Sequence, residues 1–376
     1  MSVGFDRLRV MLVGPVPPPH GGMANQTLQL ADLLRSEGAT VELVEVNAPY
    51  SPRWVGRIPV LRAGFRLLPF LARLWRAAGR ADIVHVMASS GWSWHLAAAP
   101  AVWIGRRRRV AVVLNYRGGG AAEFFRRSMT WVRPTLERCS VLVVPSPFLE
   151  RVFRGYGFSA AVVPNIVDLR RFTPAESAAR PSERPGEGPH LIVARNLEPV
   201  YDIGTALRAF GIIRKHMEGA RMSIAGSGVA RGELEALAAE LDLEDSVAFT
   251  GRLENPQMAN LYRNADLVLN PSLVDNMPIS ILEALASGVP VVSTNVGGIP
   301  DLVGDVGAAK LVAPRDPEAM ANAALQLLTD SALRSSQVQA GLKHVRRFTW
   351  EEVRGGLLGA YARAVREGVG PGRGAS

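Results

Sequence analysis

Two acidic residues, Asp275 and Glu283, lie eight positions apart around the predicted start of a helix. Pro278 lies between them, and proline suits the first turn of a helix because its missing N–H costs nothing there. A helix N-terminus offers free backbone N–H groups and the positive end of the helix dipole, so it favours an anion such as a diphosphate. Asp275 can reach a ligand over this terminus, whereas Glu283 can do so only if the ligand runs along the helix side.

The two carboxylates allow two interpretations. In the first, one acid holds the hydroxyl groups of a sugar and the other acid holds those of a ribose. In the second, Asp275 is an N-terminal capping acid and Glu283 is an ordinary residue of the helix surface. The spacing alone favours neither interpretation.

The elements that would position these acids follow from apolar patterning. A short apolar segment at 266–270 predicts a buried strand before the acidic loop. Ile281, Leu282 and Leu285 recur at helical spacing, and the β-branched segment 289–293 predicts the next buried strand. The acidic loop therefore connects a strand to a helix.

Other polar residues and glycines also follow predicted strands. They are Gly21 and Gly22 after strand 8–14, Arg117 after 110–116, Arg195 at the end of 190–195, Gly226 at the end of 220–226, and Arg252 and Leu253 after 246–250. Ligands of open α/β sheets bind at the carboxyl ends of the strands, so these positions are candidates for a binding site.

Strands alternate with helices throughout the 376 residues, which predicts an α/β protein with doubly wound parallel sheets. The length predicts two domains, and 48% apolar residues suffice for two cores. The Pro-, Ser-, Glu- and Gly-rich segment 175–189 is typical of a linker. We expect Rossmann-like domains at 1–174 and 190–349, a final helix at 350–367 and a disordered tail at 368–376.

The composition favours a cytoplasmic protein. The single cysteine, Cys139, excludes a disulfide framework and fits a reducing compartment. The N-terminal sequence MSVGFDRLRVMLVG is predicted to be a first strand and not a signal peptide. No apolar stretch approaches the ~18–20 residues of a membrane span.

Basic charge is concentrated in the first third of a chain whose net charge is +9. Segment 51–80 contains seven arginines and no acid, mixed with aromatic residues such as Trp54, Phe65 and Trp75. A basic helix with an aromatic apolar face can lie in an anionic membrane surface, the interpretation we favour. The alternative is a core-packed helix with a solvated basic face. No recognition motif supports nucleic acid as a partner.

The stretch 271–302, PSLVDNMPISILEALASGVPVVSTNVGGIPDL, resembles the donor motif of the GT-B glycosyltransferases of family 4, with Asp275 in place of a first glutamate. The resemblance covers nearly the whole chain and is strongest over 255–302. It implies two Rossmann-like domains that face a cleft, the first on the acceptor side and the second for the donor nucleotide. It also implies that the final helix crosses back to the first domain.

The resemblance implies roles for individual residues. Arg195 would neutralise a donor diphosphate, and Asp275, Glu283, Arg195 and Arg117 would form the catalytic set. The donor-binding positions would be Gly21, Gly22, Arg195, Gly226, Arg252, Leu253, Asn276, Met277, Pro278, Ile279, Ser280 and Glu283.

Two positions depart from the family pattern. The family carries a lysine a few residues after the arginine, where this chain has Val200, Tyr201 and Asp202. The family often has a histidine where Arg117 stands. A guanidinium at pH 7 donates hydrogen bonds and is not a base, so Arg117 could hold the donor's phosphates or an acidic acceptor.

The function that the resemblance implies is transfer of a sugar from a nucleotide-diphospho-sugar, with retention and without a metal or other cofactor. The sequence has no Asp-x-Asp pair and no His/Cys cluster of ligand spacing. The basic segment suggests a lipid-linked acceptor or polysaccharide precursor, a peripheral position on the inner membrane face, and a role in building surface polysaccharide or glycolipid. The alternatives are a sugar-nucleotide epimerase of GT-B architecture and a non-catalytic subunit that binds nucleotide sugars.

Overall fold

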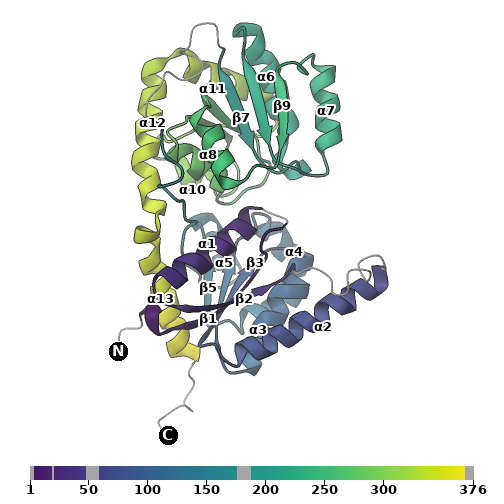
Figure 1. The fold of residues 1–376 in the computed structure, drawn as a ribbon, viewed down its shortest axis with the longest axis vertical. Coiled ribbons are helices and arrows are strands. Elements are labelled where there is room, and N and C mark those ends of the chain that lie inside the picture. Colours follow the sequence, from purple (N-terminus) through teal and green to yellow (C-terminus); the bar gives the residue numbers. More distant parts are fainter. Residues whose placement is uncertain (1–3, 19–20, 48–58, 176–187, 369–376) are drawn as a thin grey trace. The chain divides into compact units, whose positions relative to one another are not determined.

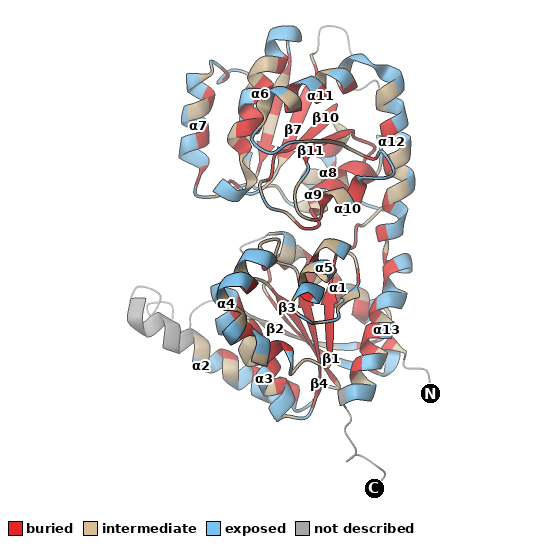
Figure 2. Ribbon diagram, turned by 180° about the vertical axis from the view of Figure 1, so that it is seen from behind, coloured by how far each residue is buried: buried red, intermediate tan, exposed pale blue. Residues whose placement is uncertain are grey.

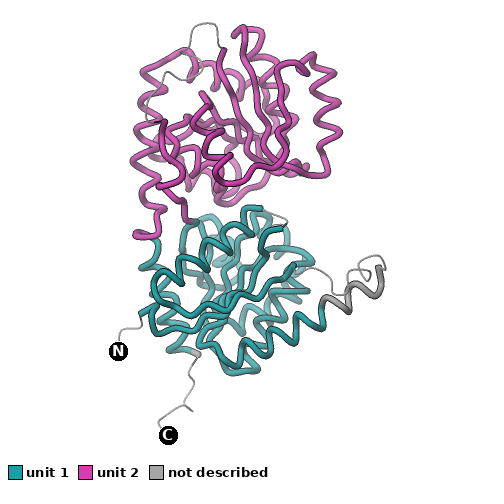
Figure 3. The backbone as a smooth tube through the Cα atoms, in the orientation of Figure 1, with its two compact units in different colours: residues 1–165, 353–376 teal, residues 166–352 magenta. Residues whose placement is uncertain are grey.

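The computed structural model describes residues 4–18, 21–47, 59–175 and 188–368, which divide into two compact units (Figure 3). Unit 1 comprises residues 1–165 and 353–376, and unit 2 comprises residues 166–352. The first unit ends before the predicted boundary at 174, because Val167 and Phe172 are buried in the core of unit 2. Most of the predicted linker and the predicted tail lie outside the described residues.

Unit 1 is built on a parallel six-stranded sheet of order β2-β1-β3-β4-β5-β6 (Figure 1). The strands are β1 (Arg9–Gly14), β2 (Thr40–Glu45), β3 (Ile83–Ala88), β4 (Ala111–Tyr116), β5 (Val141–Val144) and β6 (Ala161–Val162). The helices are η1 (Phe5–Arg7), α1 (Gly22–Ser36), α2 (Pro59–Ala78), η3 (Trp94–Ala98), α3 (Ala99–Arg107), α4 (Ala121–Leu136), α5 (Pro147–Gly155) and α13 (Trp350–Gly368).

Alternation along the strands gives this sheet two covered faces. Val84 and Val86 share a buried apolar cluster with side chains of α2, η3, α3, α4 and α5. His85 lies between them on the strand, and its ring meets Tyr361 of α13 at a centroid distance of 5.7 Å. The C-terminal helix α13 therefore covers the face opposite to α2–α5, and its Arg354 also pairs with Glu37 at 3.0 Å.

Unit 2 repeats this plan with a second parallel sheet, of order β12-β11-β10-β7-β8-β9. The strands are β7 (His190–Ala194), β8 (Arg221–Ala225), β9 (Val247–Gly251), β10 (Leu267–Asn270), β11 (Val291–Thr294) and β12 (Lys310–Val312). The helices are η5 (Pro199–Tyr201), α6 (Ile203–His216), α7 (Arg231–Glu240), α8 (Asn255–Arg263), α9 (Ile279–Ala286), α10 (Ile299–Val303), α11 (Pro317–Thr329), α12 (Ser331–Val345) and η6 (Arg346–Phe348).

Two apolar clusters cover the faces of this second sheet, and Figure 2 shows its strands buried between helices. Side chains of α6 and α11 form one cluster, and those of α8, α9 and α10 form the other. Both sheets are parallel and doubly wound, as the sequence predicted. Within the described ranges, none of the helices combines the length and apolarity needed to cross a membrane.

Candidate functional site

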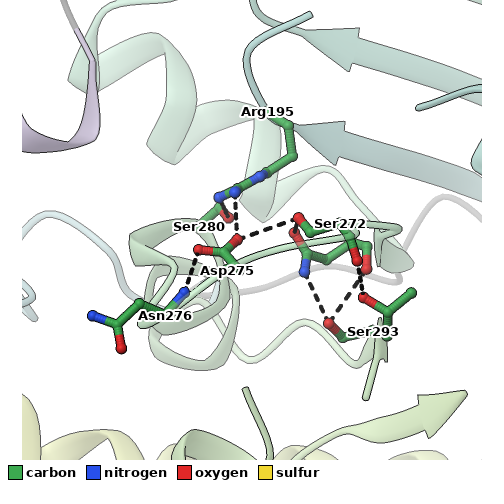
Figure 4. A network of polar contacts seen from close by, with 8 residues as sticks. Arg195, Ser272, Asp275, Asn276, Ser280 and Ser293 are labelled. Carbon is green, nitrogen blue, oxygen red and sulfur yellow. Dashed lines mark hydrogen bonds and ion pairs between the residues drawn. The ribbon is translucent and has the colours of Figure 1, made fainter. Parts of the chain in front are cut away.

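Arg195 and Asp275 form an ion pair at the carboxyl end of the unit 2 sheet (Figure 4). Arg195 follows β7, and Asp275 lies in the loop after β10, the neighbouring strand. Their side chains are only 10% and 13% exposed, so the pair is largely removed from water. Arg195 also reaches Ser280 Oγ at 3.5 Å, which ties it to the first turn of α9. Two sequence-predicted residues thus meet where predicted.

The loop that carries Asp275 is fixed by its own hydrogen bonds. Ser272 Oγ donates to the Asp275 carboxylate at 3.2 Å, and the Asn276 N–H donates to the same carboxylate at 2.9 Å. Thr294 Oγ1 at the end of β11 donates to the Ser272 carbonyl at 2.5 Å. The carboxylate is therefore held in one place before any ligand arrives.

Gly297 packs directly against this loop, which explains the glycine pair after β11. The backbone of Gly297 has φ +56°, and a Cβ there would lie 1.8 Å from the Asp275 carbonyl oxygen. The neighbouring Gly298 N–H donates to that same carbonyl at 3.2 Å. Only glycine allows both the left-handed backbone and this close approach.

Gly297→Ala should therefore lower the free energy of unfolding by about 2 kcal/mol or more, because it combines backbone strain with a steric clash. Urea unfolding followed by circular dichroism measures this loss. Gly232→Ala is the matched control, since Gly232 has open space around it and helical backbone. Equal stability of the two variants would contradict the packing described for Gly297.

Helix α9 begins beside the ion pair with an N-terminus that no side chain caps. Its N-cap is Pro278, and Asp275 does not supply a capping hydrogen bond to the helix, so the alternative of a capping acid is wrong. The first backbone N–H groups of α9 thus lack a side-chain partner, and the helix dipole adds partial positive charge. The Arg195 guanidinium, which Asp275 balances in the ion pair, therefore lies beside the partial positive charge of this terminus.

Glu283 is half-buried in the second turn of α9 and is not an ordinary surface residue. Tyr262 Oη lies 3.1 Å from Glu283 Oε2 and also 3.1 Å from the Ser280 carbonyl oxygen. Burial raises the pKa of Glu283 to about 7, although the Tyr262 hydrogen bond and the charge of Arg171 act in the opposite direction. Near pH 7 this carboxyl can therefore gain or lose a proton.

Glycines bring the ends of β8 and β9 next to Arg195. A Cβ at Gly226 would lie 2.0 Å from the Arg195 carbonyl oxygen, so Gly226 serves backbone packing there. The Gly226 N–H donates to the Gly251 carbonyl at 2.9 Å, which places the β9 end beside the same loop. Arg252 and Leu253 follow immediately, Arg252 exposed and Leu253 half-buried.

The remaining predicted positions of the loop differ in exposure. Asn276, Met277 and Pro278 are buried, and Met277 belongs to the apolar cluster under α9. Ile279 is half-buried. The side chain of Met277 therefore packs in the core and supports α9.

Tyr201 is one of the three residues, 200–202, that stand where the family pattern has a lysine. Its ring lies under the Arg195 guanidinium, 3.9 Å from the ring centroid to Arg195 Cζ. Arg195 Nε is buried and has no hydrogen-bond partner in the described residues. The aromatic ring thus helps to fix the guanidinium but adds no second positive charge.

Arg117 lies at the carboxyl end of the unit 1 sheet, immediately after β4. Its guanidinium donates to Asn165 Oδ1 at 2.6 Å, and to Gln26 Oε1 and Asn115 Oδ1 at 3.3 Å each. Gly21 and Gly22 begin α1, one turn before Gln26, and added Cβ atoms would meet nothing within 4 Å. Their glycine character has no packing cause among the described residues.

Sequence reasoning missed several residues that complete these sites. They are Tyr201, Tyr262 and Ser272 in unit 2, and Gln26 and Asn115 in unit 1. In unit 1, Asn165 also completes the site, because its side chain accepts a hydrogen bond from Arg117. Tyrosine and amide side chains occur throughout the chain, so residue type alone did not identify these residues as part of a site.

No group of three or more His, Cys, Asp or Glu side chains that could hold a metal ion occurs within the described ranges. The absence of a metal requirement stays a prediction.

Two protein-family models match the chain. The model described as Glycosyltransferase Family 4 matches residues 20–171, and the model described as Glycosyl transferases group 1 matches residues 175–344. A D-inositol 3-phosphate glycosyltransferase from Segniliparus rotundus is 33% identical over 215 residues, covering 55% of this chain and 48% of the relative. The counterpart from Stackebrandtia nassauensis is 31% identical over 237 residues, covering 60% and 54%. The chain spans about half the length of these curated relatives.

Solved structures share the fold over almost the whole chain. A sucrose-phosphate synthase from Thermosynechococcus elongatus has a TM-score of 0.77 at 21% identity, covering 95% of this chain and 99% of that one. Anabaena HepE in complex with UDP and glucose has a TM-score of 0.72 at 17% identity, covering 95% and 100%. Both are two-domain α/β proteins of the GT-B type, as the sequence predicted for this chain.

Proposed function

Because the chain belongs to the GT-B glycosyltransferases of family 4, we propose that it transfers a sugar from a nucleotide-diphospho-sugar to an acceptor, with retention of the anomeric configuration. The observation that carries the proposal is the uncapped N-terminus of α9 beside the Arg195–Asp275 pair. A diphosphate needs backbone N–H donors and positive charge, and this point of unit 2 supplies both.

The residues of unit 2 take distinct roles in this proposal. Arg195 and the N-terminus of α9 bind the diphosphate and stabilise the charge that develops as it leaves. Glu283 accepts hydrogen bonds from donor hydroxyl groups along the side of α9, and Asp275 orients Arg195 through the ion pair. The loop after β9, with Arg252 and Leu253, holds the base. None of these roles requires a protein nucleophile or a bound metal.

Donor binding should depend on pH through Glu283. Its raised pKa of about 7 means that the ionised carboxylate, the better hydrogen-bond acceptor, is lost as pH falls below 7. We expect the Kd of a UDP-sugar to fall several-fold between pH 6 and pH 8, with a midpoint near 7. The diphosphate of the donor keeps its charge throughout this range. Calorimetry at several pH values measures the effect, and Glu283→Gln should flatten the profile.

A donor-hydrolysis and transfer assay tests the proposed function itself. UDP-, GDP- and ADP-sugars are incubated with the protein, with and without acceptors that include D-inositol 3-phosphate, for which the curated relatives are named. Release of nucleoside diphosphate with sugar of retained configuration supports the proposal. Interconversion of the nucleotide sugar, or tight binding without turnover, would instead indicate an epimerase or a non-catalytic subunit. The relatives and structures described above support neither alternative.

We also propose that unit 1 binds an anionic membrane surface, which places the acceptor among lipid-linked molecules and polysaccharide precursors on the cytoplasmic side. Phe70 and Leu74 of α2 are buried in the core of unit 1. This agrees with the alternative interpretation in that one side of the helix is core-packed. Yet Leu68 is 69% exposed and Trp75 is 43% exposed. The helix therefore has a core-packed side and an exposed side that retains apolar groups.

The exposed side of α2 continues onto α3 and α4. Arg108 lies over the Trp75 ring at 4.8 Å, and Arg138 lies over the Trp103 ring at 3.8 Å. Trp103 is itself 45% exposed. Interleaved arginines and tryptophans suit the headgroup region of an anionic bilayer, where each cation contributes about 1 kcal/mol.

Replacing Arg66, Arg73 and Arg76 with Ser should weaken co-sedimentation with anionic liposomes on the order of 100-fold, because about 3 kcal/mol of attraction is removed. Arg208→Ser, Arg214→Ser and Lys215→Ser in α6 make the same change in net charge in unit 2 and serve as the control. Equal binding of the two triple variants would contradict the membrane proposal.

A further inference from the structure

The Arg117 guanidinium lies in a setting that lacks a negative charge. All three side chains that accept its hydrogen bonds, Gln26, Asn115 and Asn165, are neutral amides, and each is at most 7% exposed. No acid pairs with Arg117 in the described part of the chain, and the nearby Glu123 pairs with Arg126 at 2.7 Å instead. An ordinary structural arginine in a polar interior is matched by a carboxylate, as Arg195 is by Asp275.

Burial acts on this arginine without removing its charge. Desolvation lowers the pKa of Arg117 to about 10, which still leaves the guanidinium charged at neutral pH. Burial lowers the pKa of His85 to about 3, and the charge of Arg117 acts in the same direction, so His85 is neutral and adds no second charge. The region around Arg117 is therefore positive and lacks compensation within the described residues.

The guanidinium of Arg117 has five N–H donors, of which three are directed to described residues. Nε donates to Asn115, and the two hydrogens of Nη1 are directed to Asn165 and Gln26. Nη2 makes no hydrogen bond to a described residue. Nη2 is also not one of the fully buried atoms without a hydrogen-bond partner, which among the described residues are Trp94 Nε1, Arg195 Nε and Ser287 Oγ. Two donors on one nitrogen are thus fixed in direction and unused.

The amides hold the guanidinium in this orientation from three separate elements. Asn115 is the penultimate residue of β4, Gln26 lies in the second turn of α1, and Asn165 follows β6. His85 Nε2 accepts from Asn115 Nδ2 at 3.2 Å, and His85 Nδ1 is bonded to Tyr361 Oη at 2.8 Å, which orients the Asn115 amide. The N-terminus of α1, begun by Gly21 and Gly22, lies about 6 Å along the helix from Gln26.

We propose that Arg117, held by Gln26, Asn115 and Asn165, is a preformed receptor for one anionic oxygen group, a carboxylate or phosphate, of a substrate. The anion supplies the missing charge and receives the two free hydrogens of Nη2. This deepens the proposed function, on which it rests, because it predicts that an acidic group is part of what the enzyme recognises. That group belongs either to the acceptor or to the donor diphosphate.

Asn165→Asp tests the receptor most sharply. The substitution keeps the size of the side chain and places an internal carboxylate on Arg117, so it should keep or raise stability while it competes with the ligand. A purely structural role for Arg117 predicts the same stability but unchanged ligand binding. Arg117→Gln removes the charge itself. Arg117→Lys keeps the charge but lacks the planar guanidinium, so it should retain only part of the affinity for the anion.

Binding of four probes to the full chain is measured by calorimetry: inorganic phosphate, glucuronate, glucose 6-phosphate and UDP. Glucose, which lacks the charged group of glucuronate and glucose 6-phosphate, is the control ligand, and Arg195→Gln is the control variant.

We expect Asn165→Asp and Arg117→Gln to weaken binding of anionic probes at least tenfold. If only the binding of phosphate, glucuronate and glucose 6-phosphate is weakened, the receptor belongs to the acceptor. If the binding of UDP is weakened, it belongs to the donor. If neither variant changes the affinity for any probe, or the wild-type chain binds none, the receptor does not exist. Failure of the wild-type chain to turn over any nucleotide sugar would instead overturn the proposed function.

Discussion

Glu283→Gln is expected to lower kcat/KM for sugar transfer about 100-fold or more while the protein stays folded. Glutamine keeps the shape of the side chain but accepts hydrogen bonds more weakly than a carboxylate, and the loss of one charged hydrogen bond to a ligand corresponds to about 3 kcal/mol. Tyr262 can still donate to the amide oxygen, so the local packing of α9 should persist.

The stability of this variant separates catalysis from folding. The folded-state pKa of Glu283 is raised to about 7, so ionisation of this group costs the folded state stability as pH rises above its unfolded pKa, and the full cost is present above 7. At pH 8 Glu283→Gln should therefore be as stable as the wild type or more stable. Glu240→Gln in α7, at an exposed position, is the control. Unchanged activity of Glu283→Gln would mean that the carboxylate does not touch the donor.

Arg195→Gln should cost both activity and stability. It leaves Asp275 without its counter-charge at a position only 13% exposed, which lowers the free energy of unfolding by about 3 kcal/mol. It also removes the guanidinium that lies beside the N-terminus of α9, and we expect kcat/KM to fall about 100-fold or more. Urea unfolding and steady-state kinetics measure the two effects.

The double variant Arg195→Gln, Asp275→Asn distinguishes the two roles of the pair. It removes both charges of the pair, so neither is left unbalanced and most of the lost stability should return. Activity should not return, because the diphosphate still lacks its cation. Recovery of activity together with stability would show that Arg195 acts only as a structural partner of Asp275.

The sequence predicted the alternation of elements and the position of the donor loop because both depend on local patterns. The strands before and after the acidic loop are short apolar segments, and α9 begins directly after Pro278 as expected. The parallel order of each sheet follows from the same alternation. The resemblance to the family then placed Asp275, Glu283 and Arg195 at one site.

The state of the site residues depended on contacts between distant positions, which local patterns do not reveal. The pairing of Arg195 with Asp275 joins residues 80 positions apart, and the bond from Arg117 to Asn165 joins residues 48 apart. The raised pKa of Glu283 depends on its burial in the folded chain, which outweighs the hydrogen bond that it receives from Tyr262 of a different helix. The division between units also depended on packing, since Phe172 is buried against Tyr262 of unit 2.

In the proposed function, a sugar nucleotide places its diphosphate between Arg195 and the N-terminus of α9. A crystal structure with a non-transferable nucleotide-diphospho-sugar tests it most directly. We expect the diphosphate oxygens within hydrogen-bond distance of the Arg195 guanidinium and of the backbone N–H groups of Ile279 and Ser280, with the sugar hydroxyls toward Glu283. Density for the diphosphate at any other place in unit 2, or none in a saturated crystal, would contradict it.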